Sequence, residues 1–445
     1  MLKINKFWSI ILVLIASATY AQSGTSSPYS IAGLGELKFG GFTQHTATGG
    51  TSISQQSKNS FSPSNPASYA NLRFTVYDVG ARMSLGKLTT SALEANTRSG
   101  NFNHFAMAFP FETNRKMAVS FGTNQFSDVG YEIKNRVNTD TPSYYNLFRG
   151  SGGINRVYVG YGIEAMRNLN IGLNVNYNFG SIQAVEAKVY PNTDNRFSHS
   201  DESYFAYKGF DFDLGAQYTV WDTIHYKSRK TSIIKHTFGA ALHTKSDLKG
   251  DGYRYSETFF GRAFDGGNLI PIDTILFDDN LTDSAFKPLG FVVGYTMSKS
   301  DQWAISLEME QNGWSSITDK STGDKFFDNT RYSAGFSIVP RPSYDVRGGY
   351  LKKIRYSAGV RYENLYYNFA STQLNEIGIS FGLGLPIVKS VRLEEEKVAI
   401  ISTVNLTAEY VKRGTVSNEL IQEDYINIGI GLNLNDKWFT KRKYQ

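Results

Sequence analysis

The chain has 445 residues, a formal charge of +6, 41% hydrophobic and 14% aromatic residues, 41 glycines and no cysteine. Without cysteine it has no disulfide framework, thiolate zinc site, iron–sulfur cluster, thiol nucleophile or cysteine-linked lipid. The chain is also too apolar and too weakly charged to resemble a disordered protein.

The first 21 residues predict a signal peptide. Two lysines precede an apolar run from Phe7 to Ala16, and Thr19-Tyr20-Ala21 supplies the small residues of a cleavage site. The run is too short to cross about 30 Å of hydrocarbon as a helix, which argues against an N-terminal anchor. Because two lysines leave with residues 1–21, the charge falls from +6 to +4. A mildly basic exported chain is not expected to bind nucleic acid.

From about residue 72 onward, large apolar residues stand at every second position. Segments 171–179, 210–220, 377–385 and 426–434 alternate them with glycine, small polar residues or acids. Only an extended strand places residues i, i+2 and i+4 on one face. These strands run for about nine to fifteen residues, enough for a tilted strand to cross a bilayer and longer than in soluble sandwiches. We therefore predict an all-β, antiparallel transmembrane β-barrel whose bulky side chains face lipid.

About fourteen such segments occur, and an even number is what bacterial barrels use. They lie roughly at 72–85, 102–110, 115–125, 154–166, 168–183, 205–221, 233–246, 286–298, 302–312, 330–340, 353–366, 373–385, 398–412 and 422–434. Short turns alternate with predicted long loops at 126–153, 184–204, 247–285 and 313–329. If the first strand starts in the periplasm, the long loops lie outside the cell and both termini lie in the periplasm.

Residues 22–71 differ from the rest, because they are rich in Gly, Ser, Thr and Asn and have only short apolar stretches. Such a segment forms either a disordered periplasmic tail or a hatch folded into the barrel. Small inward-facing residues on the strands leave room for backbone, which favours the hatch. The predicted organisation is thus a signal peptide at 1–21, a hatch at 22–71, and a barrel with long extracellular loops at 72–445.

A short part of this segment resembles a known family. Gly49-Gly50-Thr51-Ser52, followed by Asn65-Pro66-Ala67, resembles the hatch-to-first-strand region of FadL-like (long-chain fatty-acid transporter) outer-membrane proteins. Residues 27–35, Ser-Pro-Tyr-Ser-Ile-Ala-Gly-Leu-Gly, are similar to the version of this family common in Bacteroidota. The resemblance implies a 14-stranded barrel, plugged by its N-terminal segment, that passes hydrophobic small molecules across the outer membrane. Gly49, Gly50, Asn65, Pro66 and Ala67 are then the hatch motif.

The resemblance leaves a second function open. The acidic segment 247–285 is not the apolar capture surface of a fatty-acid transporter, and some Bacteroidota barrels of this type are subunits of outer-membrane assembly or secretion machines. In that alternative the barrel does not conduct, and its long loops dock other outer-membrane or periplasmic proteins. Aromatic residues are favoured anchors at interfaces. The candidate docking residues are Tyr131, Tyr144, Tyr145, Tyr253, Phe259 and Phe260.

The last strand resembles the C-terminal signal that closes outer-membrane barrels by pairing with the first strand. Its residues are Ile426, Ile428, Ile430 and Leu432, followed by Trp438 and Phe439. Seven inward-facing charged residues are predicted to pair with each other, hold a plug or line a polar path: Asp211, Asp213, Glu308, Glu310, Arg361, Glu363 and Glu409. The glycine-rich strands 373–385 and 422–434 are candidates for a lateral gap beside the hatch.

The sequence contains no catalytic motif. The six histidines are scattered, and neither a Gly-x-Ser-x-Gly elbow nor a phosphate-binding Gly-x-x-x-x-Gly-Lys loop occurs. We therefore expect no enzymatic activity, no cofactor and no metal. The expected partners are outer-membrane lipid, a hydrophobic ligand and other envelope proteins.

Overall fold

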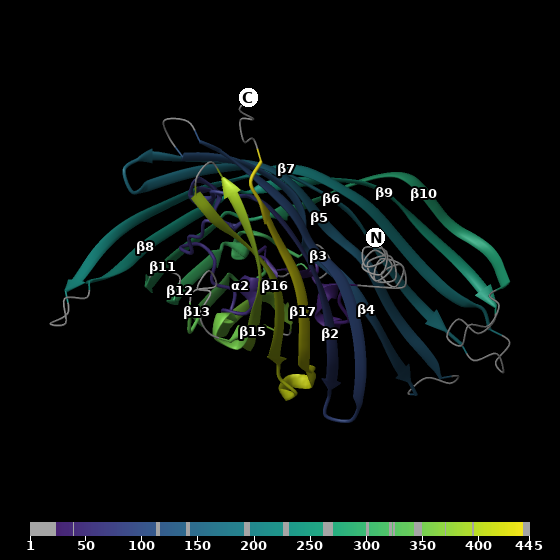
Figure 1. Ribbon diagram of the computed structural model, residues 1–445. Coiled ribbons are helices and arrows are strands. Elements are labelled where there is room, and N and C mark those ends of the chain that lie inside the picture. The colour runs from purple at the N-terminus through teal and green to yellow at the C-terminus, as the bar shows by residue number, and fades with distance from the viewer. Residues whose placement is uncertain are drawn as a thin grey trace, which may run out of the picture.

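The computed structural model describes residues 24–38, 40–112, 116–138, 143–190, 196–225, 231–260, 270–299, 302–319, 323, 325–341, 349–369, 371–393 and 396–438. Their wall is a closed antiparallel barrel of fourteen strands, which confirms the predicted fold class (Figure 1). No helix among these described ranges is long and apolar enough to cross a membrane.

The wall strands follow one another in chain order. They are β2 (Thr75–Thr89), β3 (Glu94–Glu112), β4 (Lys116–Val137), β5 (Tyr144–Met166), β6 (Leu169–Val189), β7 (Ser198–His225), β8 (Thr231–His243), β9 (Ser246–Phe260), β10 (Ile270–Lys287), β11 (Gly290–Lys299), β12 (Trp303–Asn312), β13 (Asn329–Ile338), β14 (Arg355–Phe369), β15 (Thr372–Leu393), β16 (Glu396–Gly414) and β17 (Gln422–Asp436). Because β8 continues into β9 and β10 into β11, these four elements form two wall strands. We call the end where β2 meets β3 the loop end, and the end where β3 meets β4 the turn end.

The alternation of the sequence sets which way each side chain points. On β7, Phe212 is 44% exposed on the outside, whereas its neighbour Asp211 is 1% exposed and faces the lumen. The same contrast holds on β15 between exposed Phe381 and buried Ser380, and on β17 the side chain of Ile428 is exposed. An apolar outer band with a polar interior is the arrangement that a bilayer requires.

The ring closes between β17 and β2 over an unbroken register, from Gln422 opposite Thr89 to Asp436 opposite Thr75. This confirms the predicted pairing of the last strand with the first. Ile426, Ile428 and Ile430 point outward, Leu432 is half-buried, and the Trp438 ring packs against Tyr77 and Phe109 at the turn end. Phe439 lies outside the described residues.

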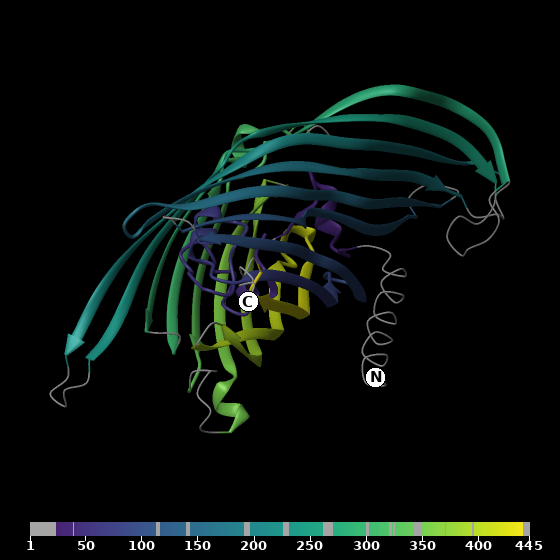
Figure 2. The ribbon, with the colours of Figure 1, turned by 45° about the horizontal axis from the view of Figure 1, so that its top comes forward.

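Strands β4 to β7, β9 and β10 extend well beyond the rest of the barrel at the loop end and curve into a tall wall (Figures 1 and 2). The segments 126–153, 184–204 and 247–285, predicted as loops, are therefore wrong as loops, because their described residues are mostly strand. Their residues pair in register, from Val137 opposite Tyr144 and from Phe260 opposite Ile270. Polar alternation above the bilayer looks like a loop in a sequence, but backbone pairing continues there because a neighbouring strand is present.

Candidate functional site

Residues 24–71 lie inside the barrel, and we call them the hatch. They contain three short helices, η1 (Pro28–Ile31), α2 (Thr43–Thr46) and η2 (Pro66–Asn71), and the two-residue strand β1 (Glu36–Leu37). Most of their side chains are buried, including Phe42, Ile53 and Tyr69. The position of residues 24–71 in the lumen is that of a plug; their role as a gate stays a prediction.

The backbone of the glycine pair in the predicted hatch motif packs against a glycine of the barrel wall. Gly49 and Gly50 have positive φ angles of 68° and 89°, a conformation that other residues adopt at a cost. A Cβ atom on Gly359 of β14 would lie 2.0 Å from the backbone nitrogen of Gly49. The Gly49 N–H also donates to Ser380 Oγ at 3.1 Å. Close backbone contact between hatch and wall therefore requires glycine on both sides.

The Asn-Pro-Ala part of the motif is held in the same way. Asn65 caps η2 by accepting from the Ala67 N–H at 3.1 Å, and its Nδ2 donates to the carbonyl of Ile53 at 2.7 Å. Pro66 occupies the first position of η2, where its missing N–H costs nothing. A Cβ on Gly172 would come within 2.4 Å of the Pro66 carbonyl carbon. The motif thus fixes the lower hatch, residues 42–71, against β6.

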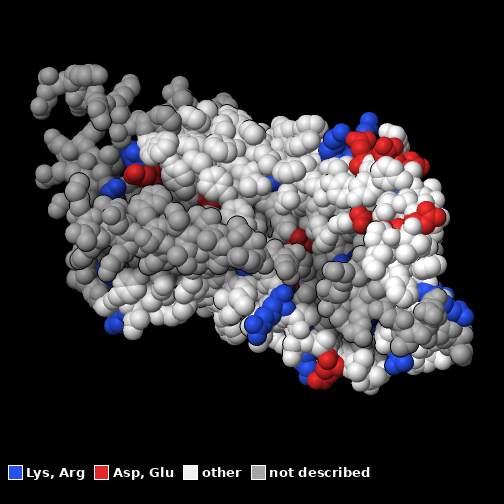
Figure 3. Space-filling model, turned by 90° about the vertical axis from the view of Figure 1, so that its right-hand side faces the viewer, with Lys and Arg blue, Asp and Glu red and all other residues white. Residues whose placement is uncertain are grey.

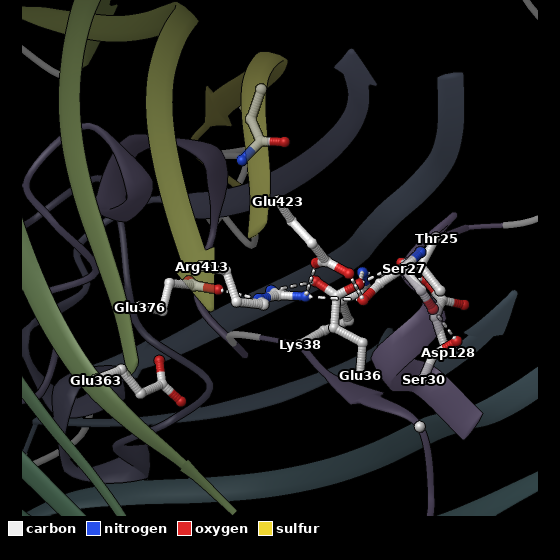
Figure 4. Close-up of polar contacts among 12 residues, drawn as sticks. Thr25, Ser27, Ser30, Glu36, Lys38, Asp128, Glu363, Glu376, Arg413 and Glu423 are labelled. Atoms are coloured by element: carbon white, nitrogen blue, oxygen red, sulfur yellow. Dashed lines mark hydrogen bonds and ion pairs between the residues drawn. The ribbon is translucent and has the colours of Figure 1, made fainter. Parts of the chain in front are cut away.

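The upper hatch, residues 24–38, is held by ion pairs, chiefly through a guanidinium that no sequence pattern singles out. Arg413 of β16 lies among one hatch carboxylate and two wall carboxylates (Figure 4). Its nitrogens are 3.0 Å from Glu36, 2.5 Å from Glu376 and 3.3 Å from Glu423. Ser27 of the hatch donates to Glu423 at 2.7 Å. One arginine therefore joins η1, β1, β15, β16 and β17.

Glu36 is also paired with Lys38, at 3.2 Å, and accepts from the Thr25 hydroxyl. Burial raises the pKa of the Glu36 carboxyl, but Lys38 and Arg413 outweigh burial and hold that pKa well below its usual range. Lys38 in turn lies 3.5 Å from Asp128 of β4. The ionised hatch carboxylate therefore lies between cations of the hatch and of the wall.

The inward-facing charges predicted from the sequence do pair with each other and hold the hatch. Arg361 contacts Glu409 at 2.8 Å, and Glu409 contacts Arg82 at 2.7 Å. Glu308 accepts backbone N–H groups of the hatch from Ser52 at 2.6 Å and Ile53 at 2.8 Å. The remaining predicted charges also lie in ionic contacts: Glu310 with Arg331, Glu363 with Arg361, Asp211 with Lys287 and Arg156, and Asp213 with His243.

The wall parts beside the upper hatch, between β3 and β4. These two strands pair from Glu112 opposite Lys116 only as far as His104 opposite Asn124, and their register ends there. Above that point β3 stays with β2 and β4 stays with β5. We call this region the parted seam. The predicted lateral gap in strands 373–385 or 422–434 is wrong, because both strands keep a neighbour on each side over most of these segments. β15 pairs with β14 across one register shift, between Asn364 and Asn368, and with β16 from Glu376 onward, and β17 pairs with β16 and β2.

The hatch occupies the parted seam on its lumenal side. Strand β1 pairs with the free edge of β4, with Glu36 opposite Asp128, and the Lys38 N–H donates to the carbonyl of Phe126 at 2.9 Å. Side chains bridge the seam as well, since Asn101 of β3 donates to Gln125 of β4 at 2.5 Å. A short strand of the plug therefore replaces the missing wall neighbour.

A cavity of about 180 Å³ lies between the hatch and the wall next to the seam. Its lining has an aromatic and aliphatic part and an ionic part. The first includes Leu37, Phe126, Trp314, Leu365, Tyr366 and Tyr367, and the second includes Arg82, Arg331, Arg361, Glu376, Glu409 and Arg413. Such a lining suits a molecule with an apolar body and a polar group.

The predicted docking aromatics do not form one exposed surface. Tyr131 and Phe259 are wrong as docking residues, because both are buried within the tall wall. Tyr144 packs on Tyr190, and Tyr253 stacks on Tyr204. The half-buried Tyr145 packs beside the Phe259 cluster, and Phe260 ends β9. These side chains mostly stabilise the tall wall itself.

Comparison with solved structures places the fold. The P. putida toluene transporter TodX is 15% identical, with a TM-score of 0.57, 90% of this chain covered and 100% of that chain. The Ralstonia pickettii toluene transporter TbuX is 12% identical, with a TM-score of 0.52 and coverages of 89% and 99%. A Pseudomonas aeruginosa FadL homologue is 12% identical, with a TM-score of 0.52 and coverages of 90% and 98%. The resemblance to FadL-like barrels is thus confirmed for the fold.

No curated protein matches the chain. The family model described as BamG matches residues 1–445, the whole length of the sequence. The chain belongs to the BamG family.

Proposed function

We propose that this protein passes hydrophobic small molecules across the outer membrane, and that the upper hatch, residues 24–38, controls a lateral path through the parted seam. The observation that carries the proposal is the end of β3–β4 pairing at His104 and Asn124, with β1 in the opening. Movement of β1 away from β4 would break few hydrogen bonds and would leave an opening in the wall. The fold shared with hydrocarbon channels supports the same function.

The cavity narrows the class of molecule. Its aromatic part offers apolar contact beside Phe126 and Tyr366, and its ionic part offers partners for a carboxylate or an amine. Because both parts belong to one cavity, an amphiphile such as a fatty acid can place its apolar body beside the first part and its polar group beside the second.

The proposal also covers the orientation of the protein in the outer membrane and the group of bacteria to which its branch of barrels belongs. Residues 1–21 are a signal peptide, the turn end and both termini face the periplasm, and the tall wall stands outside the cell. The short connections between β5 and β6 and between β11 and β12 at the turn end, opposite the tall wall, support this orientation. The opening Ser27-Pro28-Tyr29-Ser30 supports a divergent Bacteroidota branch of FadL-like barrels.

The test is uptake of a fluorescent fatty acid into liposomes that hold the purified protein. Because the chain has no cysteine, the double variant Asn101→Cys/Gln125→Cys can be cross-linked specifically with a short bismaleimide. We expect cross-linking to lower uptake at least about tenfold, since it ties the two free edges together. The matched control is Thr89→Cys/Gln422→Cys across the unbroken β17–β2 pairing, where neither residue lines the cavity. Equal uptake by both cross-linked variants, or no uptake by the native protein, would refute the proposal.

A second candidate is a barrel that does not conduct and serves as a subunit of a larger outer-membrane assembly or secretion machine. The many contacts that fix the hatch favour it, because ion pairs hold residues 24–38 and glycine-seated backbone holds residues 42–71. Extraction in mild detergent and mass spectrometry of the purified complex test this candidate. Partners in constant stoichiometry, together with absent uptake, would favour it over transport, and an isolated monomer would exclude it.

A further inference from the structure

Strand β10 has a free backbone edge beyond the barrel. Strand β11 pairs with β12 only up to Gly290 opposite Asn312, where β12 ends. The chain before Gly290 continues as β10, whose residues 270–282 pair with β9, across register shifts, and with no other described strand. An unpaired strand edge presents N–H and C=O groups that can pair with another chain.

The free edge lies outside the lipid-facing band. Lys208 of β7 and Asp251 of β9 form an exposed ion pair at 3.0 Å, with side chains that are 59% and 64% exposed. Asp251 is registered opposite Thr282 of β10. Residues 270–281 therefore lie further from the barrel than an exposed charged pair, in a position where water surrounds them.

This edge nevertheless carries large apolar side chains. Ile270, Ile272, Ile275, Leu276 and Phe277 are each between 45% and 61% exposed. Five bulky apolar residues within eight positions is a concentration that soluble surfaces seldom carry without a partner. The Phe277 ring rests near Tyr253 and Tyr255 of β9, with centroids 6.3 and 6.1 Å away.

The charge of the free β10 edge indicates what kind of segment can pair with it. Asp273, Asp278 and Asp279 are exposed, and residues 270–286 contain no lysine or arginine. Figure 3 shows the side toward which β9 and β10 point, where acidic and basic side chains both occur at the right-hand end. Two copies joined through this edge would bring aspartates against aspartates, which is unfavourable. A segment with basic side chains is complementary.

We propose that residues 270–282 of β10 bind an extended segment of a partner protein as an added strand, and that this segment alternates apolar and basic side chains. Backbone hydrogen bonds with the free edge supply the part of the affinity that does not depend on the partner's sequence. The aspartates supply selectivity for basic side chains. The register shifts at Pro271/Asp273, Thr274/Leu276 and Asp278/Leu281 limit the length of regular pairing, because bulges interrupt a ladder. This interaction is independent of transport, since β10 lines neither the seam nor the cavity over residues 270–282.

The proposal is tested with the full mature protein in nanodiscs of neutral phosphatidylcholine. The probe is a fluorescent twelve-residue peptide of alternating valine and lysine, and empty nanodiscs measure its binding to lipid. The comparison peptides carry glutamate in place of lysine, or N-methyl groups on alternate amides. We expect the lysine peptide to bind, and both comparison peptides to bind at least about tenfold more weakly.

Variants of the protein separate pairing from nonspecific charge attraction. The triple variant Asp273→Asn/Asp278→Asn/Asp279→Asn is expected to bind the lysine peptide with about tenfold lower affinity. The control is Glu419→Gln, which changes an exposed acid in the loop before β17 and should leave the affinity unchanged. Equal binding of the N-methylated peptide, or an unchanged affinity of the triple variant, would overturn the proposal. So would a disulfide-linked dimer of Phe277→Cys in native membranes, because the edge would then belong to a second copy.

Discussion

The two halves of the hatch are attached to the same barrel by different physical means. Residues 24–38 lie beside the parted seam and are held by ion pairs, chiefly of Glu36 with Arg413 and Lys38 with Asp128. Residues 42–71 lie against an unbroken wall and are held mainly by backbone contact on glycines, such as Gly49 on Gly359, together with the Glu308 carboxylate. Release of the upper half breaks ion pairs and the short β1–β4 pairing, whereas release of the lower half requires closely packed backbone to move.

This difference indicates which part of the plug moves. A buried ion pair is strongly destabilised when one partner is removed, yet it can exchange partners when several carboxylates are near. Closely packed backbone atoms cannot change partners in this way, because a densely packed interior has no free space into which they can shift. The predicted gate is therefore the upper half alone, with the lower half as its anchor.

The largest effect is expected from Arg413→Gln. It leaves Glu36, Glu376 and Glu423 without their shared cation, at a cost of about 3–5 kcal/mol. Hydrogen exchange followed by mass spectrometry should show faster exchange in residues 24–38 and little change in 42–71. Lys412→Gln, the exposed neighbour on the same strand, is the control. Faster exchange in both halves together would contradict two separate attachments.

The complementary change is Gly359→Val. A Cβ at this position would lie 2.0 Å from the Gly49 nitrogen, and overpacking of this kind costs about 1–3 kcal/mol or more. Exchange should rise in residues 42–50 while 24–38 keep their ion pairs. Gly349→Val, where nothing lies within 4 Å of the added Cβ, should be neutral. If residues 42–50 of Gly359→Val are as protected from hydrogen exchange as in the native protein, the contact between Gly49 and Gly359 does not hold the lower hatch.

A pH effect should distinguish the halves further. Burial, with repulsion from His104 and Arg355, lowers the pKa of His45 to about 3, and its Nδ1 accepts the Phe42 N–H at 3.1 Å. Below a pH of about 6.5 a released hatch takes up a proton that the seated hatch does not, so the lower half loses about 1.4 kcal/mol per pH unit. After correction for the slower intrinsic amide exchange at low pH, residues 42–50 should therefore be less protected at pH 5 than at pH 7. The same loss of protection in His45→Gln would exclude His45 as its cause.

The smallest effect is expected at an exposed ion pair away from the hatch. Lys87 and Glu94 lie 2.9 Å apart at the loop end, with side chains 50% and 60% exposed. Such pairs contribute at most about 1 kcal/mol. Lys87→Ala should leave hatch exchange and fatty-acid uptake unchanged, and a change as large as that of Arg413→Gln would mean that the assays report general instability.

Prediction from the sequence succeeded where the pattern is local. Phe212 beside Asp211 already predicts outward and inward faces, because a strand has a period of two. It failed at residues 247–285, where charged and apolar residues mix and only the presence of β7 as a neighbour makes a strand of β9. It also missed Arg413, whose glutamate partner in the hatch is 377 residues away in the chain.

The sequence by itself determined the class of fold, the approximate strand number and the lipid-facing side of each strand, since these follow from alternation within a few residues. Only the tertiary structure decided where the wall parts, which half of the hatch is held by charge, and which edge of β10 stays free. Those features depend on which distant segments become neighbours when the ring closes, and local periodicity carries no information about that.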